Sequence, residues 1–325
     1  MLRTALGLSL VTGKAFRIVR IRGGREKPGL LRQHLTCVQA AKALGEAEVS
    51  GDVLGSAELT FRPRALKAGD YTFSIGSAGS TTLVLQAVLP ALLKATAPTT
   101  VAIEGGTHNS LAPPWEFLSQ SFLPVLARMG AKVDARLVRM GFEPAGGGRL
   151  EVTVTPAPLR TLELMERGAL VRREARAIVS AVPSDVARRE LALAREELGY
   201  TESELVCDEV KAPGPGNALV LTQAYEQVTD VFVGLGARGI TAEKVARRTC
   251  GEVKRSLRTD APVGMHLADQ LIIPLVLAGG GAFRTVELTE HTRTQLDLVP
   301  RFLEVELRCQ PEPTANTFRI LASPH

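Results

Sequence analysis

The sequence predicts an α/β (α+β) protein made of three repeated βαβαββ-like units, each a sheet plus two helices, with a small inserted α/β domain. Strand-like alternating runs are interleaved with helical periodicity, and the same order of elements recurs three times. A block of different order lies between the second and third units. We expect residues 1–173 and 259–325 to form the repeat-built domain, and residues 174–258 to form the insert.

The second unit, from about Asp70 to Pro156, is the most complete. Glycine-rich turns separate its strands from its helices, as in other α/β folds. Its expected elements, in order, are a strand at 71–75, a glycine and serine turn at 76–80, a helix through 83–92, a strand at 100–103, the Gly105–Gly106 turn, a helix that Pro113 and Pro114 start and Gly130 ends, and strands at 131–138 and 149–155.

The first unit follows the same order but begins at its helix. We expect a helix at 2–12, a strand at 16–22, the Gly23–Gly24 turn, a helix through 30–44 and short strands up to Pro63. It lacks the opening strand and glycine turn that the second unit has at 71–80. Either the first unit is truly shorter, or the natural chain begins before Met1.

The third unit and the insert complete the chain. The third is expected to contain a helix at 265–278, a strand at 283–288, a helix to about Phe302 and strands at 303–308 and 317–321. The insert is expected to contain a strand at 175–182, a helix at 183–198, short strands to 234 and a helix at 241–257.

Composition sets broad limits on function. Hydrophobic residues make up 45% of the 325-residue chain and charged residues 22%, which is enough for a buried core. The net charge of +5 mildly favours anionic partners. The four cysteines are scattered without metal-ligand spacing, which favours a reduced, cytoplasmic protein. The apolar run Leu83–Ala97 carries Pro90 and Lys94 and is too short to span a membrane.

Two basic segments and one turn are candidate anion sites. Gly76–Thr82 precedes a helix and fits either a phosphate cradle or a tight turn capped by Ser80. A basic cluster surrounds the first Gly-Gly turn and comprises Arg20, Arg22, Arg25, Lys27 and Arg32. For this cluster we favour anion binding. We expect Arg20 and Arg22 to share one face of the strand, because alternate strand residues point the same way. For the basic helix 241–257 we favour a solvated face.

His291 is one of five histidines and follows the strand of the third unit. It occupies the strand-to-helix turn where the first two units have their Gly-Gly pairs. Such turns commonly hold functional residues in α/β proteins. The residues alone leave two interpretations open, a catalytic role and a capping or surface role.

Several ordered segments resemble the RNA 3′-terminal phosphate cyclase family over essentially the whole chain. These segments are Arg25–Thr36, Gly76–Ser80, Leu83–Gln86, Gly105–Asn109, Ala112–Pro114, Pro144–Gly148 and His266–Gln270. The resemblance implies the fold described above, with three related units and an insert. It also implies an ATP-dependent conversion of an RNA 3′-phosphate to a 2′,3′-cyclic phosphate.

By this resemblance, His291 is the nucleophile that takes AMP from ATP, and AMP then passes to the RNA 3′-phosphate to give RNA-(3′)pp(5′)A. A neutral imidazole suits this role because one ring nitrogen is free to attack. The implied nucleotide contacts are Gln86, His266, Leu267, Ala268, Asp269, Gln270, Pro113 and Phe117. The implied substrate or phosphate contacts are Arg3, Arg22, Arg25, Gln33 and His34.

The implied partners are ATP, RNA 3′-phosphate ends and a divalent metal, Mg²⁺ or Mn²⁺; the oligomeric state is left open. Two positions depart from the family pattern. His266 stands where members often have Tyr, and the metal-binding Glu of the family would precede Met1.

Three alternative functions remain for comparison. A non-catalytic cyclase-like protein of RNA processing or ribosome assembly would lack the nucleophilic histidine. An enolpyruvyl transferase would share related repeats without a covalent histidine. A plain RNA-binding module is possible on charge, but aromatic residues are only 4% of the chain, and the sequence offers no evident stacking platform.

Overall fold

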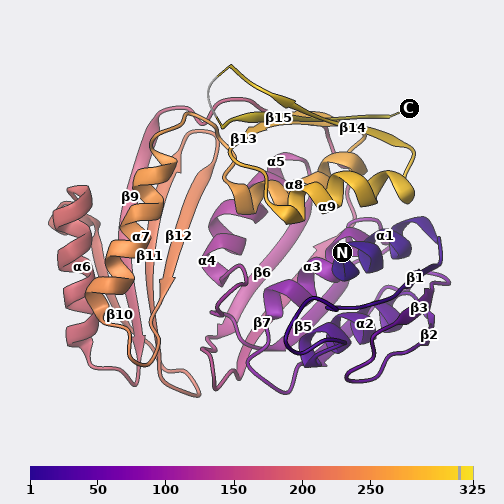
Figure 1. Cartoon of the computed structure of the whole chain (residues 1–325), viewed down its shortest axis with the longest axis horizontal. Helices are drawn as coiled ribbons and strands as arrows, with labels where there is room; N and C mark the ends of the chain where they lie inside the picture. The colour runs from indigo at the N-terminus through magenta and orange to yellow at the C-terminus, as the bar shows by residue number, and fades with distance from the viewer. Residues whose placement is uncertain (314–315, 325) are drawn as a thin grey trace.

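The computed structural model describes residues 1–313 and 316–324, which form four β-sheets flanked by helices (Figure 1). The prediction of a mixed α/β protein is confirmed. In the view of Figure 1, one sheet with two helices lies on the left, and the N-terminal and C-terminal segments lie on the right and at the top.

The sheet formed by residues 70–155 has the strand order β4-β5-β7-β6. β4 pairs in parallel with β5, and the other two pairs are antiparallel. Its elements are β4 (Asp70–Ser74), α3 (Thr81–Leu92), β5 (Thr99–Gly105), α4 (Trp115–Phe117), a π-helical turn (Leu118–Phe122), α5 (Leu123–Arg128), β6 (Lys132–Arg139) and β7 (Gly148–Thr155).

The C-terminal sheet has the order β14-β15-β13-β8, again with one parallel pair, β8 and β13, at one side. Its elements are β8 (Leu162–Leu164), α8 (Met265–Leu277), β13 (Gly281–Thr285), α9 (Glu290–Leu298), a 3₁₀ turn (Val299–Arg301), β14 (Val305–Pro311) and β15 (Phe318–Pro324). The strand expected at 283–288 begins earlier and ends at Thr285, so His291 lies in the first turn of α9.

The N-terminal sheet contains three antiparallel strands in the order β1-β3-β2. Its elements are α1 (Leu2–Thr12), β1 (Phe16–Ile18), α2 (Arg32–Leu44), β2 (Glu48–Ser50) and β3 (Leu59–Arg62). The prediction of a strand over 16–22 is wrong beyond Ile18. Arg20 and Arg22 have φ values of 54° and 53°, which are incompatible with an extended strand, so the two side chains do not share a strand face.

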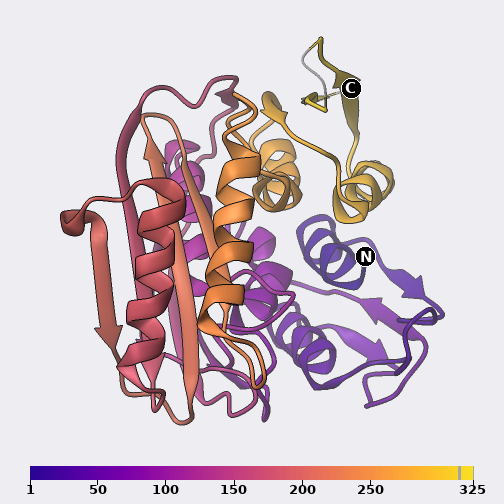
Figure 2. The same ribbon diagram turned by 60° about the vertical axis from the view of Figure 1, so that its left-hand side comes forward.

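The remaining sheet has the order β10-β9-β11-β12, and α6 and α7 cover one of its faces (Figures 1 and 2). Its own apolar cluster, which includes Ala177, Leu219 and Val253, fills the space between the sheet and these helices. Its elements are β9 (Leu170–Ser180), α6 (Ser184–Leu198), a 3₁₀ turn (Glu202–Glu204), β10 (Leu205–Glu209), β11 (Gly216–Tyr225), β12 (Thr229–Leu235) and α7 (Ala242–Ser256).

Helix α3 occupies the centre of the molecule and packs against α1, α2 and α8. Almost all of its residues are buried, as expected for the apolar run that begins at Leu83. Gly7 of α1 allows close approach, because a Cβ there would lie 3.1 Å from the Ala87 carbonyl oxygen. No helix in the described part of the chain combines the length and apolar character that crossing a bilayer requires.

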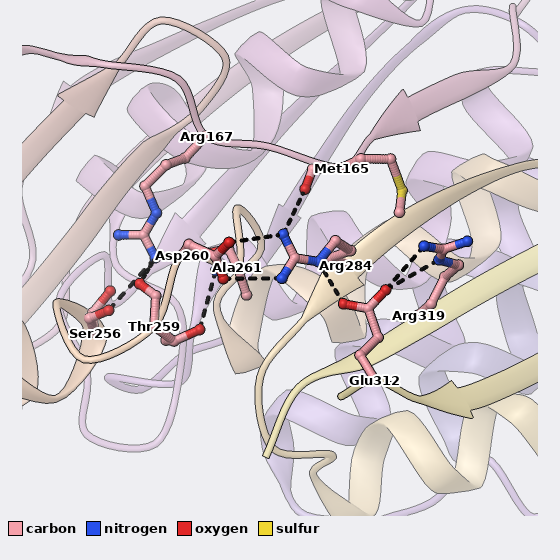
Figure 3. A network of polar contacts seen from close by, with 9 residues as sticks. All are labelled: Met165, Arg167, Ser256, Thr259, Asp260, Ala261, Arg284, Glu312 and Arg319. Atoms are coloured by element: carbon pink, nitrogen blue, oxygen red, sulfur yellow. Dashed lines mark hydrogen bonds and ion pairs between the residues drawn. The ribbon is translucent and has the colours of Figure 1, made fainter. Parts of the chain in front are cut away.

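A polar network joins the β10-β9-β11-β12 sheet to the rest of the chain where the chain enters and leaves it (Figure 3). Arg167 is 9% exposed, and its Nη2 donates to the carbonyl oxygens of Thr259 and Ala261, both at 2.7 Å. Arg284 of β13 donates to the Met165 carbonyl oxygen at 3.1 Å and pairs with Asp260. These contacts hold the two connecting segments together and so position the sheet.

Candidate active site

A cleft of about 2750 Å³ is lined by residues of helices α1, α2, α3, α7, α8 and α9, of strands β1, β11 and β12, and of several loops. Thirteen of the fourteen predicted site residues line it: His291, Gln86, His266, Leu267, Asp269, Gln270, Pro113, Phe117, Arg3, Arg22, Arg25, Gln33 and His34. The exception is Ala268, which is 1% exposed and faces the core from the opposite side of α8. Residues that are far apart in the sequence thus share one cavity.

His291 is exposed in the first turn of α9, and hydrogen bonds to Asp269 of α8 hold that turn. The Asp269 Oδ1 accepts from the hydroxyls of Thr289 at 2.6 Å and Thr292 at 2.5 Å. Thr289 also caps the helix by accepting from the Thr292 backbone N–H. The side chain of Gln295 donates to the Asp269 carbonyl oxygen. Asp269 therefore positions the segment that carries His291.

Four buried polar atoms in the cleft have no hydrogen-bond partner among the described residues: His34 Nδ1, Gln86 Nε2, Asn109 Oδ1 and Gln270 Oε1. Buried polar atoms are normally paired, because an unmade bond costs about 1–3 kcal/mol. These atoms are therefore available to a polar ligand.

The imidazole of His34 is kept neutral. Its burial, followed by the nearby guanidinium groups of Arg22 and Arg3, lowers the pKa of His34 to about 4. Burial likewise lowers the pKa of Arg3 and raises the pKa of the Cys37 thiol to about 12. Arg22 and Arg3 therefore place positive charge beside a neutral histidine, an arrangement suited to an anion.

The turn at 76–80 is attached to α2 by Gln33, whose Oε1 accepts from the Ser80 backbone N–H at 2.7 Å. Ser80 caps α3 by accepting from the Leu83 N–H, which agrees with one of the two interpretations of this turn. The Thr82 hydroxyl donates to the Pro113 carbonyl oxygen at 2.6 Å. A side chain at Gly106 would overlap Asn109 and the Ala78 carbonyl oxygen. These contacts fix one wall of the cleft.

A buried pair beside the cleft was not anticipated from the sequence. His108 Nε2 lies 2.9 Å from Glu116 Oε2, and His108 Nδ1 lies 2.9 Å from the Thr107 hydroxyl. The His108 ring stacks on Phe142 at 5.0 Å. The spacing of eight residues between His108 and Glu116 crosses a loop, so no helix or strand periodicity reveals the pair.

The cleft is positively charged. Nine Lys or Arg side chains line it, against five Asp or Glu side chains. The cleft therefore has four more positive than negative side chains, whereas the whole chain has a net charge of +5. The positive charge of the protein is thus concentrated around the candidate site, where a low-dielectric wall strengthens its attraction for anions.

No group of three or more His, Cys, Asp or Glu side chains suited to a metal ion occurs in the part of the chain that the structure describes. The divalent metal implied by the resemblance therefore has no ligand set among these residues.

These features define an α/β protein whose basic cleft is equipped for a phosphorylated substrate, with an exposed histidine at the start of a helix. The family model of RNA 3′-terminal phosphate cyclase matches residues 1–309. The chain belongs to the RNA 3′-terminal phosphate cyclase family and is an enzyme of that family.

Three relatives indicate the extent of the similarity, and each is named RNA 3′-terminal phosphate cyclase. The protein of Ralstonia nicotianae is 50% identical over 98% of this chain and 92% of its own length. The protein of Ectopseudomonas mendocina is 48% identical over 95% of this chain and 91% of its own length. The protein of Salmonella enteritidis is 46% identical over 98% of this chain and 94% of its own length.

Proposed function

We propose that the protein converts an RNA 3′-terminal phosphate to a 2′,3′-cyclic phosphate at the expense of ATP, with His291 as the nucleophile. The observation that carries this proposal is the exposed His291 in the basic cleft, on a helix end that Asp269 holds. Membership of the cyclase family supports the same reaction.

In the first step, a neutral ring nitrogen of His291 attacks the α-phosphorus of ATP. The bond between the α-phosphorus and the oxygen bridging to the β-phosphorus breaks, and pyrophosphate leaves. The product is a histidine–AMP phosphoramidate. Arg3, Arg22 and Arg25 supply fixed positive charge in the same cleft, which stabilises the additional negative charge of the transition state.

In the second step, an oxygen of the RNA 3′-phosphate attacks the phosphorus of AMP, the P–N bond breaks and RNA-(3′)pp(5′)A forms. In the third step, the neighbouring 2′-oxygen attacks the former 3′-phosphate, loses its proton and expels AMP. The ring closes without a further nucleophile from the protein. Dividing the reaction into steps gives each displacement an activated leaving group.

We propose that Gln86 and Gln270 contact the nucleotide through their unpaired amide atoms, while Pro113 and Phe117 supply apolar surface for the base. Leu267 and His266 adjoin this surface at the start of α8. Gln33 and His34 face the cleft from α2, beside the arginines, and suit contacts with phosphate groups.

We further propose that three sheets are repeats of one unit and that the fourth is an inserted domain. In the sheets β4-β5-β7-β6 and β8-β13-β15-β14, a parallel pair is followed by the fourth strand of the unit and then by the third. The three strands of the N-terminal sheet, β1-β3-β2, follow the same order as the second, fourth and third strands of such a unit. The β10-β9-β11-β12 sheet differs in order and has its own core. This supports a boundary near 174 and 258, with β9 extending to Leu170.

The test is incubation with α-labelled ATP and either Mg²⁺ or Mn²⁺, followed by a search for an adduct that is labile in acid and stable in alkali. We expect an adduct in the parent protein, none in His291→Ala, and parental labelling in Arg293→Gln, which alters an exposed side chain of the same helix. An adduct that survives His291→Ala would contradict the proposal. Complete absence of labelling in the parent protein would favour a non-catalytic cyclase-like protein.

A further inference from the structure

Helix α7 carries a stripe of basic residues that faces the cleft. Lys244, Arg248 and Arg255 line the cavity together with His291, and their spacing places them on one side of the helix. Glu252 lies in the same stripe, and Arg238 and Arg258 flank the helix at either end and also line the cavity. From the sequence we expected the basic face of this helix to be solvated. In the structure, the part of that face formed by Lys244, Arg248 and Arg255 lines the cavity.

Two cations of the stripe have no ion-pair partner among the residues that the structure describes. In the described chain, the ion pairs of α7 are Arg189–Glu243, Arg248–Glu252 and Lys254–Glu197. Lys244 and Arg255 therefore form no ion pair with any described residue, and both are exposed. The Arg248–Glu252 pair is loose, at 3.8 Å, and Arg248 is 83% exposed. Exposed, unpaired cations that line a cavity are available to an external anion.

The stripe also has the dimensions of a strand of nucleic acid. From Lys244 to Arg255 the helix rises about 16 Å. At about 3.4 Å per stacked nucleotide, this distance corresponds to four or five nucleotides. In Figure 2, α7 lies nearer than α6 to the helices of the other units. Lys244, Arg248 and Arg255, which span most of its length, line the cavity.

We propose that the cleft-facing stripe of α7 binds the phosphodiester backbone of the RNA nucleotides that precede the reactive 3′ end. This inference rests on the proposed function, which places that end at His291. Contacts to the backbone would lower the KM of longer RNAs without selecting a base sequence. The arginines near His34 would then hold the terminal phosphate, and α7 would hold the rest of the strand.

The test compares the double variant Lys244→Gln/Arg255→Gln with the control Arg247→Gln. Arg247 is an exposed cation of the same helix outside the cavity lining, and it lies near Glu197 on α6. Two substrates are used, a 3′-phosphorylated RNA of about ten nucleotides and a nucleoside 3′,5′-bisphosphate, the shorter substrate being unable to span the stripe.

For the longer RNA, we expect KM to rise roughly tenfold in the double variant, with less than a twofold change for the short substrate. The slope of log affinity against log salt should fall by about 1.4, because each lost phosphate contact removes about 0.7. Arg247→Gln should behave as the parent protein. Equal effects of the double variant on both substrates, or an unchanged salt slope, would overturn the proposal.

The outcomes for the two proposals can be separated. Binding of a fluorescent 3′-phosphorylated RNA, followed by anisotropy, requires no turnover. If the parent protein binds this RNA and the double variant binds it about tenfold more weakly, the stripe is supported even when no His291 adduct forms. If both bind it equally while the adduct forms, the proposed function stands and the stripe is wrong.

Discussion

At the scale of single residues, the arrangement of the site depends on Asp269. Its carboxylate accepts hydrogen bonds from the hydroxyls of Thr289 and Thr292 at the start of α9, so the helix end that presents His291 is attached to α8. Hydrogen bonds to a carboxylate are worth about 1.5–3 kcal/mol each. A histidine in the first turn of an isolated helix would fray with that turn, whereas here its backbone is held on two sides.

This attachment predicts the behaviour of Thr292→Val, which removes one hydroxyl with little change of volume. Thr292 is 1% exposed and does not line the cleft, so ATP would not contact it. We expect the rate of His291 adenylylation to fall roughly tenfold, as a loss of about 1.4 kcal/mol implies, with KM for ATP unchanged. Thr294→Val, in the same helix, should retain the parental rate. A changed KM with an unchanged rate would contradict the positioning role.

Much of the candidate site is predictable at this scale, because the sequence segments that resemble the cyclase family carry the signal. Thirteen of the fourteen predicted residues reach one cleft. Ala268 does not, because adjacent helical positions point in different directions and its neighbours occupy the exposed side. The His108–Glu116 pair and Asn109 escaped prediction, since loop conformation brings them together and no periodic pattern encodes it.

At the scale of elements, α6 and β11 enclose a carboxyl group that the structure leaves partly unsatisfied. Glu190 is fully buried, its Oε2 accepts from Asn217 Nδ2 at 2.9 Å, and its Oε1 has no partner among the described residues. Burial raises the pKa of Glu190 to about 7, with the Asn217 hydrogen bond acting in the opposite direction. The α6 packing therefore favours a protonated carboxyl group.

This burial predicts that the stability of the protein depends on pH. Between pH 4.5 and about 7 the folded state holds a proton on Glu190 that the unfolded state releases, so stability falls as pH rises through this window. The full effect amounts to about 3 kcal/mol. We expect Glu190→Gln to unfold at a higher temperature than the parent protein at pH 8 and to lose this pH dependence. Glu196→Gln, an exposed site on α6, provides the control; a parental pH profile in Glu190→Gln would contradict the prediction.

Element boundaries were predicted less well than element order. Helices α1 and α3 and strands β5 to β7 follow from periodicity and from glycine and proline positions. The strand expected to reach Arg22 ends at Ile18 because Arg20 and Arg22 adopt left-handed backbone conformations, which arginine rarely favours. The residue types at these positions do not predict left-handed backbone conformations, because tertiary contacts around the segment determine them.

At the scale of the whole molecule, the cleft exists only while the β10-β9-β11-β12 sheet stays in place beside the other three. The chain enters this sheet near Arg167 and leaves it near Ala261, and the network of Figure 3 closes the two connections. Arg284 extends the network to Glu312 and Arg319 of the C-terminal sheet. A few guanidinium groups thus couple the connections to the neighbouring sheet.

Arg167 is the buried member of this network, and its loss should loosen the connections. Arg167→Met keeps the apolar length of the side chain but removes the donor to the carbonyl oxygens of Ser256, Thr259 and Ala261. It also removes the guanidinium that lies 4.9 Å from the centre of the Tyr225 ring. Leaving buried carbonyls unpaired costs about 1–3 kcal/mol. We therefore expect denaturant unfolding to report a loss of stability of about 2–4 kcal/mol.

Limited proteolysis distinguishes a loosened connection from a general loss of stability. Cleavage in Arg167→Met should concentrate in segments 165–169 and 256–264, where the network is broken, and should precede cleavage within the sheets. Arg172→Gln changes an exposed arginine that pairs with Glu174 on β9, and it should be cut as slowly as the parent protein. Uniform cleavage throughout Arg167→Met, or none beyond the parental rate, would show that the sheet is held mainly by its apolar contacts with Phe142 and not by the polar network.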